Sequence, residues 1–157
     1  MIALNSKKNL GLTLVELLVV ISILAILGLV ILTSFIGFRS NQSLQKDAEL
    51  VVELLNQARN QTISSKNLSQ YGVNFSTSTA TVFTGSVYSA LASDNEVHNL
   101  LSASNSISVS LNGGSSSVVF ERLSGGTNQN GTITLTSSGL SGTKTVTIYS
   151  TGVISSN

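Results

Sequence analysis

The sequence predicts an α+β protein in which a long N-terminal helix packs on an antiparallel, β-rich C-terminal domain. Three observations lead to this prediction. Residues 12–38 form a predominantly apolar run. Residues 39–66 keep the helical spacing of apolar residues but become polar. After Asn67, short segments alternate apolar and polar residues with a period of two, which is typical of half-buried strands.

The apolar run is long enough to cross a membrane. As a helix, residues 12–38 would span roughly 40 Å at ~1.5 Å per residue, and a bilayer core needs about 20 apolar residues. Lys7 and Lys8 precede the run. The positive-inside rule predicts that these two lysines stay in the cytoplasm, so the C-terminal domain is expected on the other side of the inner membrane.

One acid, Glu16, lies inside this run. A secretory signal peptide is a poor match, because its apolar region is about 7–15 residues long and ends at a small-residue cleavage site. A plain membrane anchor accounts for the length and the lysines but leaves Glu16 unexplained. A carboxylate within the bilayer costs about 2.5–3.5 kcal/mol, so it marks a functional site that needs compensation.

Residues 8–16, KNLGLTLVE, resemble the class III leader junction of type IV pilins and pseudopilins. The resemblance implies that a prepilin peptidase cuts after Gly11 and methylates Leu12, where family members usually have Phe. In that family, the carboxylate matching Glu16 neutralises the α-amino group of a neighbouring subunit. Opposite charges in a low-dielectric core attract strongly when paired and are costly alone, which agrees with this role.

The resemblance divides the chain into four segments. These are a leader peptide (1–11), a transmembrane and assembly helix (12–38), an amphipathic helix (39–66) and a β-rich head domain (67–157). Most relatives carry a Pro at the position of Thr33, but this chain has no Pro. Any bend is therefore expected at Gly28, at Gly37 or at Thr33 and Ser34, since such residues soften a helix.

The amphipathic segment carries one apolar stripe with alternating spacings of four and three. It consists of Leu44, Ala48, Val51, Leu55, Ala58 and Thr62. We expect this stripe to be buried against the protein's own sheet. Leu50 and Leu54 widen the apolar face, and either core packing or contact with a neighbouring subunit accounts for them.

Strands are predicted over residues 71–76, 79–84, 106–111, 118–121, 132–136 and 145–149, with a short last one at 153–154. Residues 85–105 allow either a helix with a capping box at Ser93 and Glu96 or a strand at 97–101, and we favour strand or irregular structure. This order of strands and glycine turns is similar to that of the H-type pseudopilins and related minor pilins.

The composition argues against an enzyme. The chain lacks Cys, and its one histidine, His98, has no second imidazole or thiolate to complete a metal site. No phosphate-binding loop or catalytic serine motif is present, so we expect no catalytic residues, cofactors or metal. After Asn67 the only basic side chains are Arg122 and Lys144, too few for direct nucleic-acid binding.

The sequence therefore predicts a structural subunit of a type IV pilus-like filament, in pilus biogenesis or protein secretion. Its expected partners are the inner membrane, prepilin peptidase and other pilin or pseudopilin subunits. Two alternatives stay open: a membrane-anchored binding or adhesion module, and a minor pilin of DNA uptake. Major pilin, minor pilin and secretion pseudopilin are not distinguished by this chain.

Overall fold

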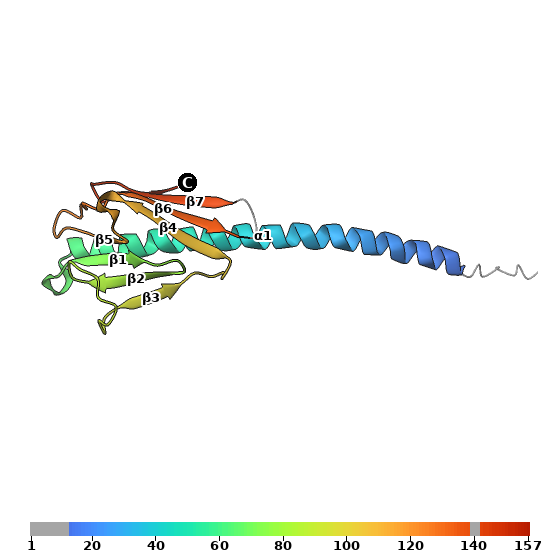
Figure 1. Ribbon diagram of the computed structural model, residues 1–157, viewed down its shortest axis with the longest axis horizontal. Coiled ribbons are helices and arrows are strands. Elements are labelled where there is room, and N and C mark those ends of the chain that lie inside the picture. Colours follow the sequence, from blue (N-terminus) through green and yellow to red (C-terminus); the bar gives the residue numbers. More distant parts are fainter. Residues whose placement is uncertain (1–12, 139–141) are drawn as a thin grey trace, which may run out of the picture. The chain divides into compact units, whose positions relative to one another are not determined.

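The computed structural model describes residues 13–138 and 142–157 and divides into two compact units, Met1–Ile36 and Gly37–Asn157. One helix, α1 (Leu14–Ile63), contributes to both units (Figure 1). The second unit adds two antiparallel sheets that pack on its part of α1. The predicted α+β fold, a long N-terminal helix with an antiparallel β-rich domain, is confirmed.

Helix α1 continues through the position where relatives carry Pro. Thr33 and Ser34 both belong to the helix, because Thr33 keeps the backbone N–H that a Pro would remove. Leu, Ala and other straight-chain residues are frequent on both sides of this point and favour helix. The chain leaves the helix after Ile63, where Ser65 adopts a left-handed backbone with φ 49°.

Each sheet has four strands (Figure 1). The first has the order β3-β2-β1-β5 and consists of β1 (Tyr71–Phe75), β2 (Thr79–Thr84), β3 (Glu96–Asn99) and β5 (Ser117–Val119). The second has the order β4-β6-β7-β8 and consists of β4 (Asn105–Leu111), β6 (Gly131–Ser137), β7 (Thr143–Ile148) and β8 (Ile154–Ser156). Two short 3₁₀ turns complete the unit, η1 (Lys66–Leu68) and η2 (Asn112–Gly114).

The predicted hairpin is β1–β2, with Tyr71 opposite Thr84 and Phe75 opposite Ala80. In the ambiguous stretch, β3 is a strand that pairs with β2, so a helix capped by Ser93 is wrong there. The strand predicted to reach residue 121 ends at Val119, because β5 pairs with β1 only over Ser117–Val119.

The core lies between α1 and the two sheets. Its α1 members are the predicted stripe, and each is at most 2% exposed: Leu44, Ala48, Val51, Leu55, Ala58 and Thr62. Leu54 is also 2% exposed, so it belongs to this core, and Leu50 packs partly buried against it. The first sheet supplies Val73 and Val118, and the second supplies Ile133 and Val146.

A buried polar contact joins α1 to the segment that leads into β4. Asp47 is 0% exposed. Its Oδ1 accepts a hydrogen bond from the Leu101 backbone N–H at 2.8 Å, and its Oδ2 accepts one from Asn105 Nδ2 at 2.6 Å. A buried carboxylate is costly without such donors, so this contact fixes the β3–β4 connection to the helix.

Candidate functional site

The predicted processing junction lies outside the described residues. Lys7, Lys8, Gly11 and Leu12 all fall within residues 1–12. Cleavage after Gly11, methylation of Leu12 and the cytoplasmic placement of the two lysines therefore stay predictions.

The description begins at Thr13, whose side chain caps α1. Thr13 Oγ1 accepts a hydrogen bond from the Glu16 N–H at 3.2 Å, and the Thr13 carbonyl accepts one from the Leu17 N–H at 3.1 Å. Thr-x-x-Glu is also the sequence of a capping box, in which the first side chain bonds the third helical N–H. This capping signal is present in the sequence but was not part of the predicted leader junction. Glu16 therefore takes part in the N-terminal cap of α1, besides its predicted role in assembly.

The Glu16 carboxylate stands in the first turn of α1, and the residue is exposed. The N-terminal end of a helix carries a partial positive charge, which favours an acid there. Because Glu16 is exposed, a group outside this chain has access to its carboxylate.

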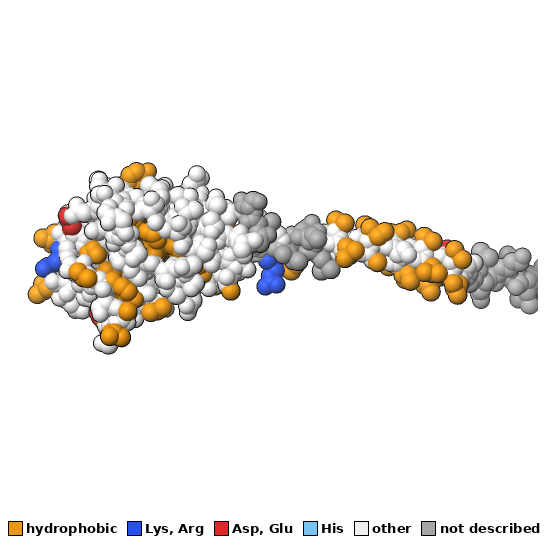
Figure 2. Space-filling view, viewed as in Figure 1, with side chains coloured by type: hydrophobic (Ala, Val, Ile, Leu, Met, Phe, Trp, Pro, Cys, Tyr) orange, Lys and Arg blue, Asp and Glu red, His pale blue; other side chains and the backbone are white. Residues whose placement is uncertain are grey.

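The first part of α1 presents an exposed apolar surface in the part of the chain that the structure describes. The stretch Leu14–Ile31 is long and apolar enough to cross a membrane, and none of it is buried. Length and composition alone do not separate such a helix from the core helix of a soluble protein or from a signal sequence. Here, however, the large apolar side chains stay exposed, from 76% at Leu14 down to 45% at Val20, and Figure 2 shows them in orange. A surface of this kind marks contact with lipid or with other protein chains.

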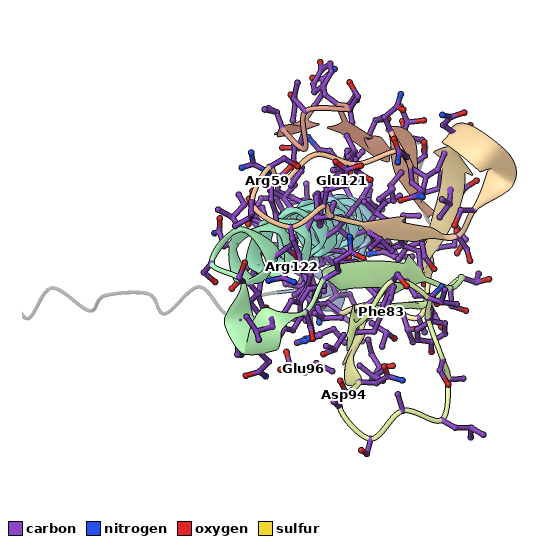
Figure 3. The ribbon with its side chains drawn as sticks, turned by 90° about the vertical axis from the view of Figure 1, so that its left-hand side faces the viewer. Arg59, Phe83, Asp94, Glu96, Glu121 and Arg122 are labelled. Atoms are coloured by element: carbon purple, nitrogen blue, oxygen red, sulfur yellow. The ribbon has the colours of Figure 1, made fainter. Side chains whose placement is uncertain are left out.

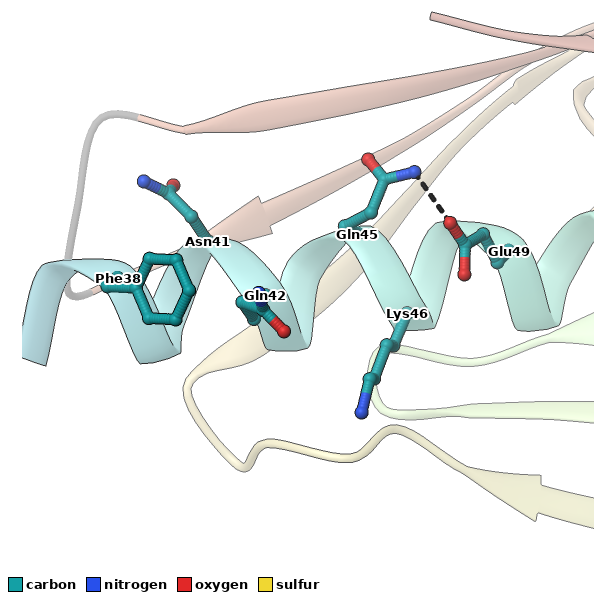
Figure 4. A pocket seen from close by; sticks show the side chains of 6 residues that line it. All are labelled: Phe38, Asn41, Gln42, Gln45, Lys46 and Glu49. Carbon is teal, nitrogen blue, oxygen red and sulfur yellow. Dashed lines mark hydrogen bonds between the residues drawn. The ribbon is translucent and has the colours of Figure 1, made fainter.

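The second unit has a shallow, open groove on the exposed side of α1, near the start of its part of the helix, and residues of this helix alone line it. The groove has a volume of about 400 Å³ and is lined by Phe38, Asn41, Gln42, Gln45, Lys46 and Glu49 (Figure 4). Phe38 is 60% exposed and forms its apolar end. Gln45 Nε2 donates to Glu49 Oε1 at 2.8 Å, which holds that carboxylate at the groove's other end.

Three turns meet where α1 ends. Arg59 Nε donates to the Gly125 carbonyl at 3.2 Å. A Cβ at Gly125 would lie 2.6 Å from the Ile63 side chain, and a Cβ at Gly152 would collide with the Gly125 carbonyl. The β5–β6 loop and the β7–β8 turn are therefore packed closely on the helix end, beside η1.

The β5–β6 loop at this end is internally braced. The Glu121 N–H donates to the Gly126 carbonyl, and the Gly125 N–H donates back to the Glu121 carbonyl, both at 2.8 Å. The Glu121 carboxylate accepts from Ser124 Oγ and Asn128 Nδ2. Figure 3 looks onto this end and labels Arg59, Glu121 and Arg122. The loop thus presents its outward side chains from a fixed backbone.

Two leucines at this end have a backbone conformation that suits glycine. Leu68 in η1 has φ 57° and Leu123 in the braced loop has φ 67°. A residue with a Cβ in this region costs on the order of 1–3 kcal/mol, and such strain is concentrated at functional sites. Both side chains are also exposed, at 76% and 78%. Strain and apolar exposure together make Leu68 and Leu123 candidate surface residues for a contact outside the fold.

The acidic side chains and the histidine of the described residues do not gather into a metal site. Among residues 13–138 and 142–157 there is no cluster of three or more His, Cys, Asp or Glu side chains suited to a metal ion. His98 is half-buried on β3. Asp94 and Glu96 border a cavity of about 200 Å³, and Gln57 Nε2 donates to Glu96 Oε2 at 3.0 Å.

Comparison with known families agrees with these observations. Residues 6–32 match the prokaryotic N-terminal methylation motif, which covers the predicted junction and the apolar part of α1. Residues 47–152 match the family described as type II transport protein GspH, over more than half of the chain. The chain belongs to the GspH family. Comparisons with curated proteins and with solved structures give no significant match.

Membership of the GspH family confirms the predicted resemblance to H-type pseudopilins. The matched region begins at Asp47, the buried acid of α1, and ends at Gly152, the glycine of the β7–β8 turn. The GspH family and the methylation motif support a structural subunit of type II secretion or of a pilus, not a member of an enzyme family. The family implies assembly with other pilin subunits, and together with the apolar N-terminal helix it indicates membrane anchoring.

Proposed function

We propose that the chain is a subunit of a type IV pilus-like filament, as a minor pilin or a secretion pseudopilin, and that it is stored in the inner membrane as a precursor. Lys7 and Lys8 keep the leader in the cytoplasm. Prepilin peptidase cuts after Gly11 and methylates Leu12. The second unit stands on the periplasmic or extracellular side, and the processed chain then leaves the bilayer to join the filament.

The observation that carries this proposal is the uncovered apolar surface of Leu14–Ile31. Burying one Leu, Ile or Val side chain completely contributes about 1.5–3 kcal/mol. The large apolar side chains of this stretch are each more than two-fifths exposed, so a large part of that contribution is available to a covering partner. Lipid covers them before assembly. The apolar helices of neighbouring subunits cover them afterwards, which lets the same surface serve storage and assembly.

Glu16 makes this transfer selective. The carboxylate costs about 2.5–3.5 kcal/mol in a bilayer when it is unpaired. Pairing with the new α-amino group at Leu12 of a neighbouring subunit removes two isolated charges from an apolar surrounding. Since the amine exists only after cleavage, uncut chains are kept out of the filament, and the pair fixes the axial offset between neighbours.

Processing and assembly are tested separately. Mass spectrometry of the purified chain should find a methylated N-terminal Leu12, and Gly11→Ala should leave the leader attached and exclude the chain from filaments. Glu16→Ala should be cut normally but should assemble poorly. Glu53→Ala is the matched control, because Glu53 is an exposed glutamate on the same helix within the second unit.

A mature protein that retains Met1 would instead identify a permanently anchored binding module. Normal filament incorporation of the Gly11→Ala precursor would contradict the processing step. Unchanged assembly of Glu16→Ala would remove the pairing step while leaving the processing step intact.

A further inference from the structure

We propose that the second unit docks on the anionic phospholipid surface of the membrane that stores the precursor, through a patch formed by α1 and the β3–β4 connection. The patch consists of the residues that line one open cavity of about 270 Å³: Phe38, Arg39, Gln42, Ser43, Lys46 and Leu101. The inference rests on the proposed function, because docking requires a chain held in the membrane. It requires neither cleavage nor assembly.

The apolar part of the patch comes from two elements. Phe38 is 60% exposed on α1, and Leu101 is 65% exposed on the β3–β4 connection. The Leu101 N–H donates to the buried Oδ1 of Asp47 at 2.8 Å, which holds this connection on the helix. An exposed aromatic ring beside an exposed leucine suits the boundary between water and lipid, where apolar side chains are buried at the level of the headgroups.

The charged side chains of the patch have one sign. The second unit contains six basic and six acidic side chains, so it has no excess of either as a whole. The patch carries Arg39 and Lys46 but no acid. The two acids nearest in sequence to Lys46 are not part of it, because Asp47 is buried and Glu49 accepts a hydrogen bond from Gln45. Two cations without an acid favour a ligand that carries phosphate groups.

The two cations and the leucine lie on the same side of the helix. Figure 4 shows Lys46 pointing from α1 toward the β3–β4 connection, away from Gln45. Lys46 and Arg39 are seven residues apart, which is two helical turns, so both contribute to one face. A flat bilayer surface can therefore contact the exposed basic and apolar side chains of the patch together, and it needs no enclosing wall.

The position of the patch in the chain favours a membrane over a soluble ligand. The membrane-length stretch ends at Ile31, and Phe38 follows seven residues later. Seven residues reach at most roughly 25 Å, so the chain itself keeps Phe38 close to the bilayer surface. A tethered surface meets lipid at a high effective concentration, so that weak attractions are enough for docking.

Docking would distinguish the stored subunit from the assembled one. The attraction between basic side chains and an anionic bilayer falls off within about 8 Å at physiological ionic strength. The second unit therefore loses this contact when the chain leaves the bilayer. The patch is a storage contact that adds to the burial of the apolar helix in lipid.

The chain contains no tryptophan, so Leu101→Trp introduces a single fluorescent reporter into the patch. We would reconstitute the full-length precursor in vesicles of phosphatidylcholine, with or without phosphatidylglycerol, that carry lipid spin-labelled near the headgroup. Tryptophan emission should be quenched several-fold more strongly in the anionic vesicles. Added salt should reduce this difference, because it screens the charges at the lipid surface.

Three variants serve as comparisons. Arg39→Gln combined with Lys46→Gln should lower the quenching to the level of neutral vesicles. Lys66→Gln combined with Arg122→Gln is the matched control, because it removes two exposed basic side chains of the same unit outside the patch, and it should leave the quenching unchanged. Leu91→Trp, in place of Leu101→Trp, reports from a side chain 96% exposed on the β2–β3 connection and should stay unquenched in both kinds of vesicle. Thermal melting of each variant should match that of the parent chain.

Three results would overturn the inference. Equal quenching of Leu101→Trp in neutral and anionic vesicles would exclude recognition of lipid phosphate. Absence of quenching in both would show that the patch stays in water. Unchanged quenching after the loss of Arg39 and Lys46 would show that these two cations do not attract the bilayer.

Failure of the proposed function is distinguishable from these results. It would appear in cells, as chain that alkaline carbonate washes from membranes or as chain that keeps its leader and stays out of filaments. The vesicle measurement uses the reconstituted precursor and depends on neither cleavage nor filament formation.

Discussion

The Asp47 contact leads to a quantitative prediction. Asp47→Ala removes the acceptors of the Leu101 N–H and of Asn105 Nδ2. Hydrogen bonds to a charged group contribute about 1.5–3 kcal/mol each, so losing two costs about 3–6 kcal/mol. The substitution also removes a buried carboxylate whose desolvation is unfavourable, which offsets part of the stability lost with the two hydrogen bonds. We therefore expect a net loss of about 2–4 kcal/mol in the free energy of unfolding.

Asp47→Asn should be much milder, for a reason specific to this site. Asn105 Oδ1 is buried and has no hydrogen-bond partner among the described residues. If the Asn105 amide rotates by half a turn, its Oδ1 accepts a hydrogen bond from the introduced amide. The introduced carbonyl oxygen still accepts from Leu101. We therefore expect Asp47→Asn to cost at most about 1 kcal/mol.

Tyrosine fluorescence can report these differences. All three tyrosines lie in the second unit, and Tyr71 is 5% exposed in its core. Guanidinium unfolding of full-length chain in detergent micelles should give equal m-values for both variants and the parent. Glu53→Ala, an exposed change on the same helix, should stay within about 0.5 kcal/mol of the parent. Equal losses for Asp47→Asn and Asp47→Ala would refute the amide rotation. Losses no larger than that of Glu53→Ala would refute the stabilising role of the buried Asp47 contact.

Three further changes test other parts of the second unit by the same unfolding measurement. Thr62→Val keeps the side-chain volume but removes Oγ1, which accepts a hydrogen bond from the Tyr71 N–H at 2.9 Å. This change should cost about 1–3 kcal/mol in the free energy of unfolding. An unchanged free energy of unfolding would contradict a stabilising role for this hydrogen bond. Phe120→Ala opens a cavity at a fully buried site and should cost about 3–5 kcal/mol, so a loss below 1 kcal/mol would show that the core collapses around it. Gly152→Ala introduces a Cβ against the Gly125 carbonyl at φ 76°, and should cost more than Gly28→Ala, where the added Cβ meets nothing within 4 Å.

Local periodicity predicted the parts of the fold that depend on neighbouring residues. The stripe on α1 was predictable because a spacing of four and three places its members on one helix face. The alternation in β6 was predictable for the same kind of reason, since one side of that strand is buried. β1 alternates in sequence, with Tyr71, Val73 and Phe75 at every second position, and this alternation predicted the strand. The strand is nevertheless buried over nearly its whole length, which its alternation did not predict.

Asp47 shows where such reasoning stops. It lies three residues after Leu44 and four before Val51, so helix geometry places it on the buried face. An acid there looks inconsistent with a core position until its donors are known. Those donors come from Leu101 and Asn105, 54 and 58 residues later, and no local pattern specifies that pairing.

The candidate surfaces divide in the same way. Glu16 could be chosen as a candidate residue from the sequence alone, because it is the one acid in an apolar run. Its role in assembly stays a prediction. The packing of the β5–β6 loop on the end of α1 was not predictable, because Arg59 and Gly125 are 66 residues apart in sequence. The left-handed backbone of Leu123 also has no sequence signature, since the residue there is not glycine.

Glu16 itself now has two explanations, and one substitution separates them. A capping box accepts Gln as well as Glu at its third position, so Glu16→Gln keeps the cap while removing the charge. If capping by Thr13 and Glu16 is the whole role, Glu16→Gln filaments should form like those of the parent. If the charge pairs with a neighbour's amine, Glu16→Gln should assemble as poorly as Glu16→Ala, although both are cut normally.

Thr13→Ala is the reciprocal change, since it removes the Oγ1 that accepts the Glu16 N–H and leaves the carboxylate in place. Loss of an N-cap costs about 0.5–2 kcal/mol of helix stability, which should appear as faster hydrogen exchange at the Glu16 amide. The charge hypothesis requires Thr13→Ala to assemble far better than Glu16→Gln. The opposite order would make helix capping, and not charge pairing, the reason for an acid in this apolar helix.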